Sequence, residues 1–188
     1  MKIIATLAAC FWLSACAAAP GEQVRSDVQG FEREQATERL TARGQAFAAV
    51  GDTTRAQEYL AAALEAGASD QQLTPQLIAL CVRDGRYQLA IEHAERYLLR
   101  HPDDQRMRFV LGSLFAALGE GSSAERELKR VSEREDQNPN VKYALAVVMR
   151  DQRDDPLEAD RYFRDYLRLA PHGEHVAEAR ASLLERIR

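Results

Sequence analysis

Histidine and glutamate side chains near the end of the sequence are of types that can ligate a metal ion. His172, Glu174 and His175 stand within four residues, in the run HGEH. Helical zinc sites use the spacing HExxH, which places both histidines on one helix face, and HGEH lacks it. We interpret these residues as part of one turn of the final helix, with both histidines exposed to solvent, and His93 and His101 as surface residues. We therefore expect no metal site.

Cys81 is the second candidate for chemistry, because a cysteine thiolate can act as a nucleophile. It lies in the apolar run LIALCV with no histidine near it in the sequence, so a small buried hydrophobe is the simpler interpretation. The glycine-rich run GEGSS lacks the preceding strand and the lysine of a phosphate-binding loop. There is no nucleophile elbow either. We expect the protein not to be an enzyme and to use no cofactor.

Cys16 belongs to a different kind of chemistry, lipid attachment. Residues 3–13 are an apolar run broken by Thr6 and preceded by Lys2, too short for a membrane-spanning helix but typical of an export signal. The run ends in LSAC at residues 13–16. This resembles the lipobox of bacterial lipoproteins, whose signal peptide is removed before a cysteine that becomes acylated. The alternative is an ordinary secreted protein cleaved at another bond.

The resemblance to lipoproteins implies a location. Ala17 follows the cysteine, whereas similar enterobacterial lipoproteins use an aspartate there for retention in the inner membrane. We expect lipid anchoring in the bacterial cell envelope, at the outer membrane and facing the periplasm.

Charge narrows the class of partner. The formal net charge is −4, and the cations alternate with acids in runs such as EREQATER and RDQRDD. Nucleic-acid-binding domains gather their cations on one face, whereas mixed runs of this kind are typical of solvated helix faces. We expect neither a nucleic-acid partner nor a small-molecule substrate.

A repeat organises the rest of the chain. Helical patterns follow one another without an alternating strand pattern, and an alanine opens the second helix of each pair: Ala56, Ala90, Ala124 and Ala159. Their spacings are 34, 34 and 35 residues. A fixed period of this length indicates stacked helix pairs.

The pattern resembles the tetratricopeptide repeat, a unit of two helices. The family's small residue twelve positions before the alanine is matched by Gly44 and Gly112, and its turn five positions before by Gly51, Gly85 and Gly119. The resemblance implies an all-α fold, a right-handed α-solenoid of about four repeats with a C-terminal capping helix.

Ile78 and Val147 depart from the family pattern, because they replace the small residue that lets paired helices approach. In the second pair Ala94 stands where the first has Leu60, and this exchange conserves volume. The predicted organisation is a signal peptide (1–15), a lipidated cysteine and flexible tether (16–30), four repeats within 31–171 (about 37–70, 71–104, 105–138 and 140–171) and a capping helix (172–188).

The repeat resemblance implies a concave groove lined by the first helix of each pair. Some similar proteins clamp a carboxylate there with lysines, asparagines and an arginine, and of the matching positions only Arg106 could serve. The groove positions are instead mainly small or apolar: Gln45, Ala48, Ala49, Ala79, Val82, Arg106, Phe109, Ser113, Ala116 and Val148. Either a partner's apolar segment or helix lies there, with Phe109 as anchor, or these side chains meet one another in a tightly wound superhelix.

Two functions fit these predictions. The first is a membrane-anchored scaffold that helps an envelope machine to assemble, such as a pilus, secretion or outer-membrane machine. The second is a periplasmic adaptor or regulator that recruits cell-wall enzymes. The partner would be a protein in both, and the sequence does not separate them.

Overall fold

The structure, a computed structural model, describes residues 20–184 as helices joined by short turns, with no strand in that range. The signal peptide, Cys16 and residues 185–188 lie outside the described residues. The helices are α1 (Pro20–Ala49), α2 (Thr53–Glu65), α3 (Asp70–Arg83), α4 (Tyr87–Arg100), α5 (Gln105–Ala117), α6 (Gly121–Arg134), α7 (Pro139–Asp151), α8 (Pro156–Leu169) and α9 (Val176–Ala181).

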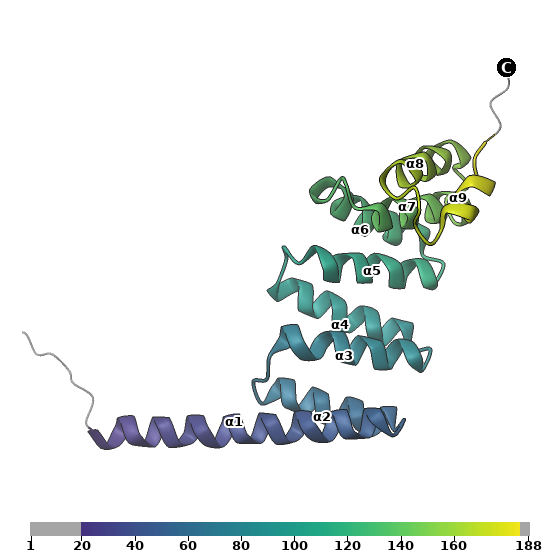
Figure 1. The fold of residues 1–188 in the computed structure, drawn as a ribbon. Helices are drawn as coiled ribbons and strands as arrows, with labels where there is room; N and C mark the ends of the chain where they lie inside the picture. Colours follow the sequence, from purple (N-terminus) through teal and green to yellow (C-terminus); the bar gives the residue numbers. More distant parts are fainter. Residues whose placement is uncertain (1–19, 185–188) are drawn as a thin grey trace, which may run out of the picture.

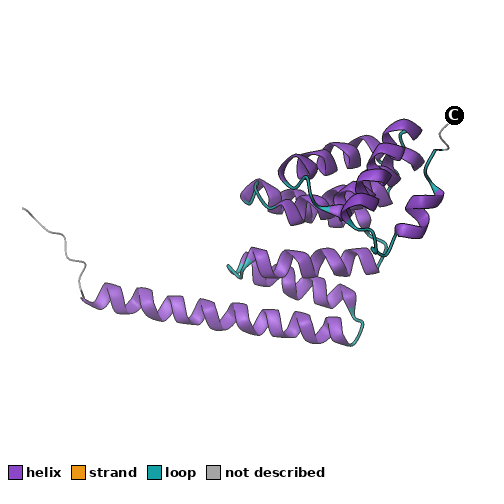
Figure 2. Ribbon diagram, turned by 45° about the horizontal axis from the view of Figure 1, so that its top comes forward, coloured by secondary structure: helices purple, strands orange, loops and turns teal. Residues whose placement is uncertain are grey.

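The helices form antiparallel pairs that stack on one another, as Figures 1 and 2 show. The pairs are α1 with α2, α3 with α4, α5 with α6, and α7 with α8, and the second helix of each pair contacts the first helix of the next. The predicted all-α stack of helix pairs is confirmed.

The turn inside each pair depends on one residue with a left-handed backbone. Gly51, Gly85 and Gly119 have φ angles of 83°, 71° and 78°, and Asp154 takes the equivalent place in the last pair with φ 52°. At Gly85 the following N–H, from Arg86, bonds the Cys81 carbonyl at 2.8 Å. This is the bonding of a Schellman helix end, which glycine favours because it has no Cβ.

Small residues let the paired helices approach closely. A Cβ added to Gly44 would lie 2.7 Å from Leu60 Cγ, and one added to Gly112 would lie 2.8 Å from Leu128 Cγ. The pair α3–α4 carries the reverse arrangement, with Ile78 and Ala94 both buried. The predicted exchange of large and small residues is therefore present.

Two clusters of buried side chains make up the core. The smaller one joins α2 to α3 through residues such as Leu60, Leu73 and Leu77. The larger one runs from α3 to α9 and includes Cys81, which is fully buried. Burial raises the pKa of the Cys81 thiol. The interpretation of Cys81 as a core residue is confirmed.

The prediction of a flexible tether was wrong for residues 20–30, which belong to α1. Pro20 stands at the first helical position, where its fixed φ suits a helix. Glu22, Gln23, Arg25 and Gln29 are residue types that favour helix. Extending a helix that has already formed also costs little free energy. The first part of α1 therefore projects beyond the stack (Figures 1 and 2).

The C-terminal capping helix is shorter than predicted. α9 covers only Val176–Ala181, because residues 171–175 form turns instead of helix. Ala179 is fully buried, and Val176 and Leu183 pack against the larger core cluster. These three residues thus cover the end of the stack. Among residues 20–184, no helix is both long and apolar enough to cross a membrane.

Candidate functional site

A cavity of about 360 Å³ lies between the first helices of the third and fourth pairs, α5 and α7. The base includes Leu128 of α6, and His175 from the turn before α9 closes one end. This size falls within the range of small ligand sites. The groove is therefore open between α5 and α7, and its own side chains do not fill it there.

The α5 wall of the cavity is made by Phe109, Ser113 and Ala116. These residues are four and three apart, so they share one helix face. The Ser113 hydroxyl donates its hydrogen to the Phe109 carbonyl of the same helix at 2.9 Å. Phe109 packs against the core yet stays half-buried. The wall thus presents an aromatic ring beside small side chains.

The α7 wall is made by Asn140, Ala144, Val147 and Val148. Val147 stands at the position where the third pair has Gly112, and here its side chain faces the cavity. Val148 is 1% exposed, so it forms part of the base instead of a free surface. The cavity is consequently apolar on both sides.

An aromatic pair closes the C-terminal end of the cavity. The rings of Tyr143 and His175 stack 3.9 Å apart at an angle of 10°. The Tyr143 hydroxyl donates to Glu178, and Arg150 binds the same carboxylate at 3.1 Å. These bonds tie α7 to α9 and hold the end of the cavity in place. The prediction that His175 is exposed was wrong because its ring covers Tyr143, whereas His172 is exposed.

Two tyrosines, Tyr97, which is buried, and Tyr143, which is partly buried, make the stability of the stack sensitive to alkali. Burial and the Glu178 carboxylate raise the pKa of Tyr143 to about 12, and burial and Asp104 do the same for Tyr97. An unfolded tyrosine has a pKa of about 10. The stabilisation is thus complete below pH 10 and is lost as the pH rises towards 12.

We expect the melting temperature, followed by circular dichroism, to fall between pH 10 and pH 12. The double variant Tyr97→Phe, Tyr143→Phe should show a shallower fall over the same interval, because phenylalanine does not ionise. Equal slopes for the two proteins would contradict this account.

The structure separates the predicted groove residues into two sets. Phe109, Ser113, Ala116 and Val148 line the cavity described above. The other six lie outside it: Gln45, Ala48, Ala49, Ala79, Val82 and Arg106. Of these, Gln45 bonds Gln76 at 3.2 Å, and Ala79, Val82 and Arg106 are exposed.

Sequence reasoning missed six of the ten residues that line the cavity. Asn140 and Ala144 lie eight and four residues before Val148, and this spacing on one helix face could have identified them. Tyr143 and His175 come together only through the fold of the C-terminal turn, for which the sequence carries no local signal.

No group of three or more potential metal ligands comes together within residues 20–184. The polar residues that line the cavity between α5 and α7 are a serine, an asparagine, a tyrosine and a histidine. The arrangement is suited to binding an apolar group.

Comparison with known proteins identifies the repeat. Residues 82–148, from the end of α3 through most of α7, match the family described as tetratricopeptide repeat. This segment carries tetratricopeptide repeats. The matched segment contains both α5 and α6 and most of the cavity wall. No curated protein matches the sequence.

Solved tetratricopeptide repeat structures share the fold. A tetratricopeptide repeat protein from Parabacteroides merdae aligns with TM-score 0.71 and 21% identity, over 79% of this chain and 59% of that one. YrrB, described as having an unusual peptide-binding site, aligns with TM-score 0.67 and 18% identity, over 85% and 88%. MamA from Desulfovibrio magneticus RS-1 aligns with TM-score 0.67 and 15% identity, over 78% and 84%.

Tetratricopeptide repeat domains bind protein or peptide partners and are typically non-catalytic scaffolds. The chain spans 59% of the length of the Parabacteroides protein. At these identities the likeness concerns the fold, and the properties of the cavity come from this chain's own residues.

Proposed function

We propose that the protein is a non-catalytic scaffold that binds an apolar segment of a protein partner in the cavity between α5 and α7. One observation carries this proposal: an apolar cavity of about 360 Å³ stays open between two first helices, on the face that tetratricopeptide proteins use for binding. Buried aromatic anchors supply much of the energy of such contacts. Phe109 provides one here.

The shape of the cavity favours one or two large apolar side chains over a whole helix. The α5 wall has small side chains at Ser113 and Ala116, so the backbone of a partner can approach closely there. Tyr143 and His175 limit the space at the C-terminal end. A short extended segment with one buried side chain fits these limits.

The proposal places the scaffold in the bacterial cell envelope, anchored through a lipid on Cys16, where it aids assembly of an envelope machine. The run LSAC supports the anchor, and α1 begins four residues after the cysteine. With 30 residues at about 1.5 Å each, α1 is about 45 Å long. The first part of α1, which projects beyond the stack, would hold the stack away from the membrane surface.

A photocrosslinking experiment tests both parts of the proposal. Benzoylphenylalanine replaces Ser113 in the cavity, or Leu99 in a control, since Leu99 is 85% exposed on α4. Each version is made in full-length protein and in a Cys16→Ser protein. After irradiation in the native cells, mass spectrometry identifies the crosslinked segments.

We expect the Ser113 position, and not Leu99, to yield crosslinks to an apolar segment of one envelope protein. We also expect the Cys16→Ser change to release the protein from membranes and to lower the yield. Equal products from Ser113 and Leu99 would contradict the cavity. If the Cys16→Ser protein keeps its membrane association and gives the same crosslinked products, the anchor is contradicted. That result would favour an adaptor whose repeats alone select the partner.

A further inference from the structure

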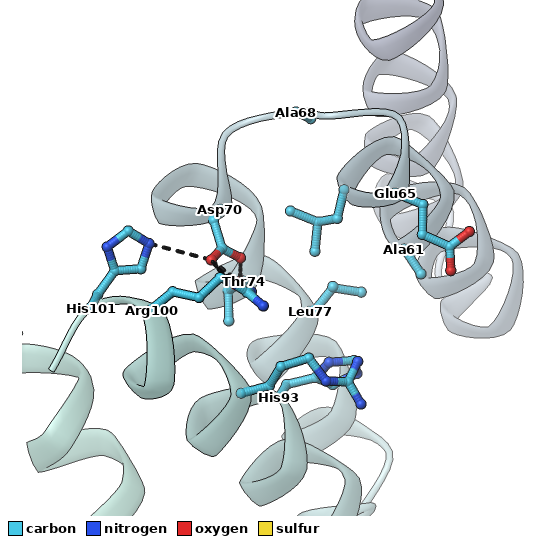
Figure 3. A pocket seen from close by; sticks show the side chains of 11 residues that line it. Ala61, Glu65, Ala68, Asp70, Thr74, Leu77, His93, Arg100 and His101 are labelled. Atoms are coloured by element: carbon cyan, nitrogen blue, oxygen red, sulfur yellow. Dashed lines mark hydrogen bonds and ion pairs between the residues drawn. The ribbon is translucent and has the colours of Figure 1, made fainter.

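A second cavity lies among the second helices of the first two pairs and the start of α3 (Figure 3). It measures about 510 Å³. One side is apolar, with Leu64 of α2 and Leu77 of α3. The opposite side carries His93 and Arg96 of α4. This cavity shares no lining residue with the one between α5 and α7.

In the next repeat, an arginine–glutamate ion pair fills the equivalent space. Because the two repeats are offset by 34 residues, Thr74 corresponds to Arg108 and His93 to Glu127. Arg108 donates to Glu127 at 3.0 Å and to the Pro102 carbonyl at 2.6 Å. It thereby spans from α6 to the linker before α5, with a buried carboxylate at its end.

In the second repeat both partners of that ion pair are replaced. Thr74 is short, and its hydroxyl donates to Asp70 at 2.8 Å, so it does not reach α4. His93 supplies no carboxylate. Ala68, which corresponds to Pro102, lines the cavity that results. The space is thus the place of a missing arginine–glutamate pair.

One cation of the cavity keeps a position that serves the carboxylate in the next repeat. Arg130 lies 3.4 Å from Glu127, and its counterpart here is Arg96. Within residues 20–184 no carboxylate pairs with Arg96. Burial lowers the pKa of His93, the charge of Arg96 lowers it further, and the Glu92 carboxylate raises it by a smaller amount. An anion beside these two groups would pair with Arg96 and favour the charged form of His93.

The two acids that line the cavity do not meet this need. Asp70 is held by Arg100 at 2.7 Å and His101 at 3.3 Å, on the far side of Thr74. Glu65 stands at the opposite edge, and Figure 3 shows its carboxylate directed away from His93.

We propose that this cavity binds a glutamate side chain of a protein partner, which takes the place that Glu127 holds in the next repeat, with an apolar neighbour of that glutamate on Leu64 and Leu77. The protein thus has a second docking surface, on the face opposite the first helices. Arg96 and His93 contact the carboxylate, and the apolar wall selects acidic residues flanked by leucine-like side chains.

Nuclear magnetic resonance titration with short peptides tests this proposal. The probe is acetyl-Leu-Glu-Leu-amide, and the matched control is acetyl-Leu-Gln-Leu-amide, which differs only in the charge. Acetyl-Leu-Gln-Leu with a free C-terminal carboxylate forms a third arm. We expect the glutamate peptide to shift the resonances of Thr74, Leu77 and His93, to raise the pKa of His93, and to bind at least tenfold more tightly than the glutamine control.

Protein variants provide the second half of the test. Arg96→Gln should weaken binding at least fivefold, whereas Arg130→Gln, at the equivalent place in the next repeat, should leave it unchanged. Thr74→Arg combined with His93→Glu rebuilds the Arg108–Glu127 pair and should abolish binding. Arg96 is exposed, so its variant remains informative even if the double variant does not fold.

Three results would overturn the proposal: equal binding of the glutamate and glutamine peptides, unchanged binding in Arg96→Gln, or shifts centred on Phe109 and Tyr143. Stronger binding of the free C-terminal carboxylate would overturn the assignment to a side chain. The variant Phe109→Glu should bind the glutamate peptide normally, which separates this surface from the apolar cavity.

Discussion

Replacing Gly112 with isoleucine is expected to destabilise the protein by about 3 kcal/mol, the upper range for overpacking a core. A Cβ at this position would lie 2.8 Å from Leu128 Cγ and 3.0 Å from its Cδ2, so α5 and α6 must move apart. For a chain of this size, the change corresponds to a loss of roughly 6 to 12 °C in melting temperature. Circular dichroism at 222 nm during heating measures it.

The second pair of helices indicates how to rescue this variant. There, isoleucine at the same repeat position, Ile78, packs beside Ala94 in place of a leucine. Leu128→Ala alone should cost about 3 kcal/mol, because it leaves a cavity beside Gly112. Combined with Gly112→Ile, it should restore most of the lost stability, which gives a strongly favourable coupling between the two sites.

A matched control tests whether the effect comes from packing instead of backbone freedom. Gly30 is also helical, but nothing lies within 4 Å of a Cβ added there. Gly30→Ile should therefore be neutral or slightly stabilising, since isoleucine has a higher helix propensity than glycine. Additive effects of Gly112→Ile and Leu128→Ala would contradict the packing explanation.

The helix pairs could be predicted from the sequence because their signals are local. The spacing of Ala56, Ala90 and Ala124 reflects the length of two helices and two turns, and the turn inside each pair needs a residue that tolerates positive φ. The sequence also showed that the small–large pair Gly44–Leu60 is replaced by the large–small pair Ile78–Ala94 in the next repeat. Such an exchange is expected because the two facing positions must fill a constant volume.

The sequence did not predict features that depend on distant contacts. α1 extends to Pro20 because its packed second half nucleates a long helix, and the polar composition of residues 20–30 conceals this. His175 covers Tyr143 only because turns at residues 171–175 bring it back over α7. By contrast, the replacement of Arg108 and Glu127 by Thr74 and His93 could have been read from the offset of 34 residues.

Replacing Phe109 with glutamate is expected to abolish binding of the partner segment while the helices remain intact. The ring forms the aromatic part of the α5 wall, so the change removes the anchor and places a charge where the ligand would bury it. Loss of an anchor and burial of an unpaired charge each cost more than 1 kcal/mol. We expect affinity to fall about 100-fold, or about 2.7 kcal/mol.

The measurement uses a fluorescent peptide with the sequence crosslinked from Ser113, titrated with each protein and followed by fluorescence anisotropy. Leu99→Glu is the matched control, because it adds the same charge at a fully accessible place on α4, and it should bind like the unmodified protein. Phe109→Ala should lose about tenfold, since it removes the anchor without adding a charge. Unchanged affinity in Phe109→Glu, with circular dichroism showing an intact stack, would mean that the partner lies elsewhere and that the cavity between α5 and α7 is only a gap in the packing.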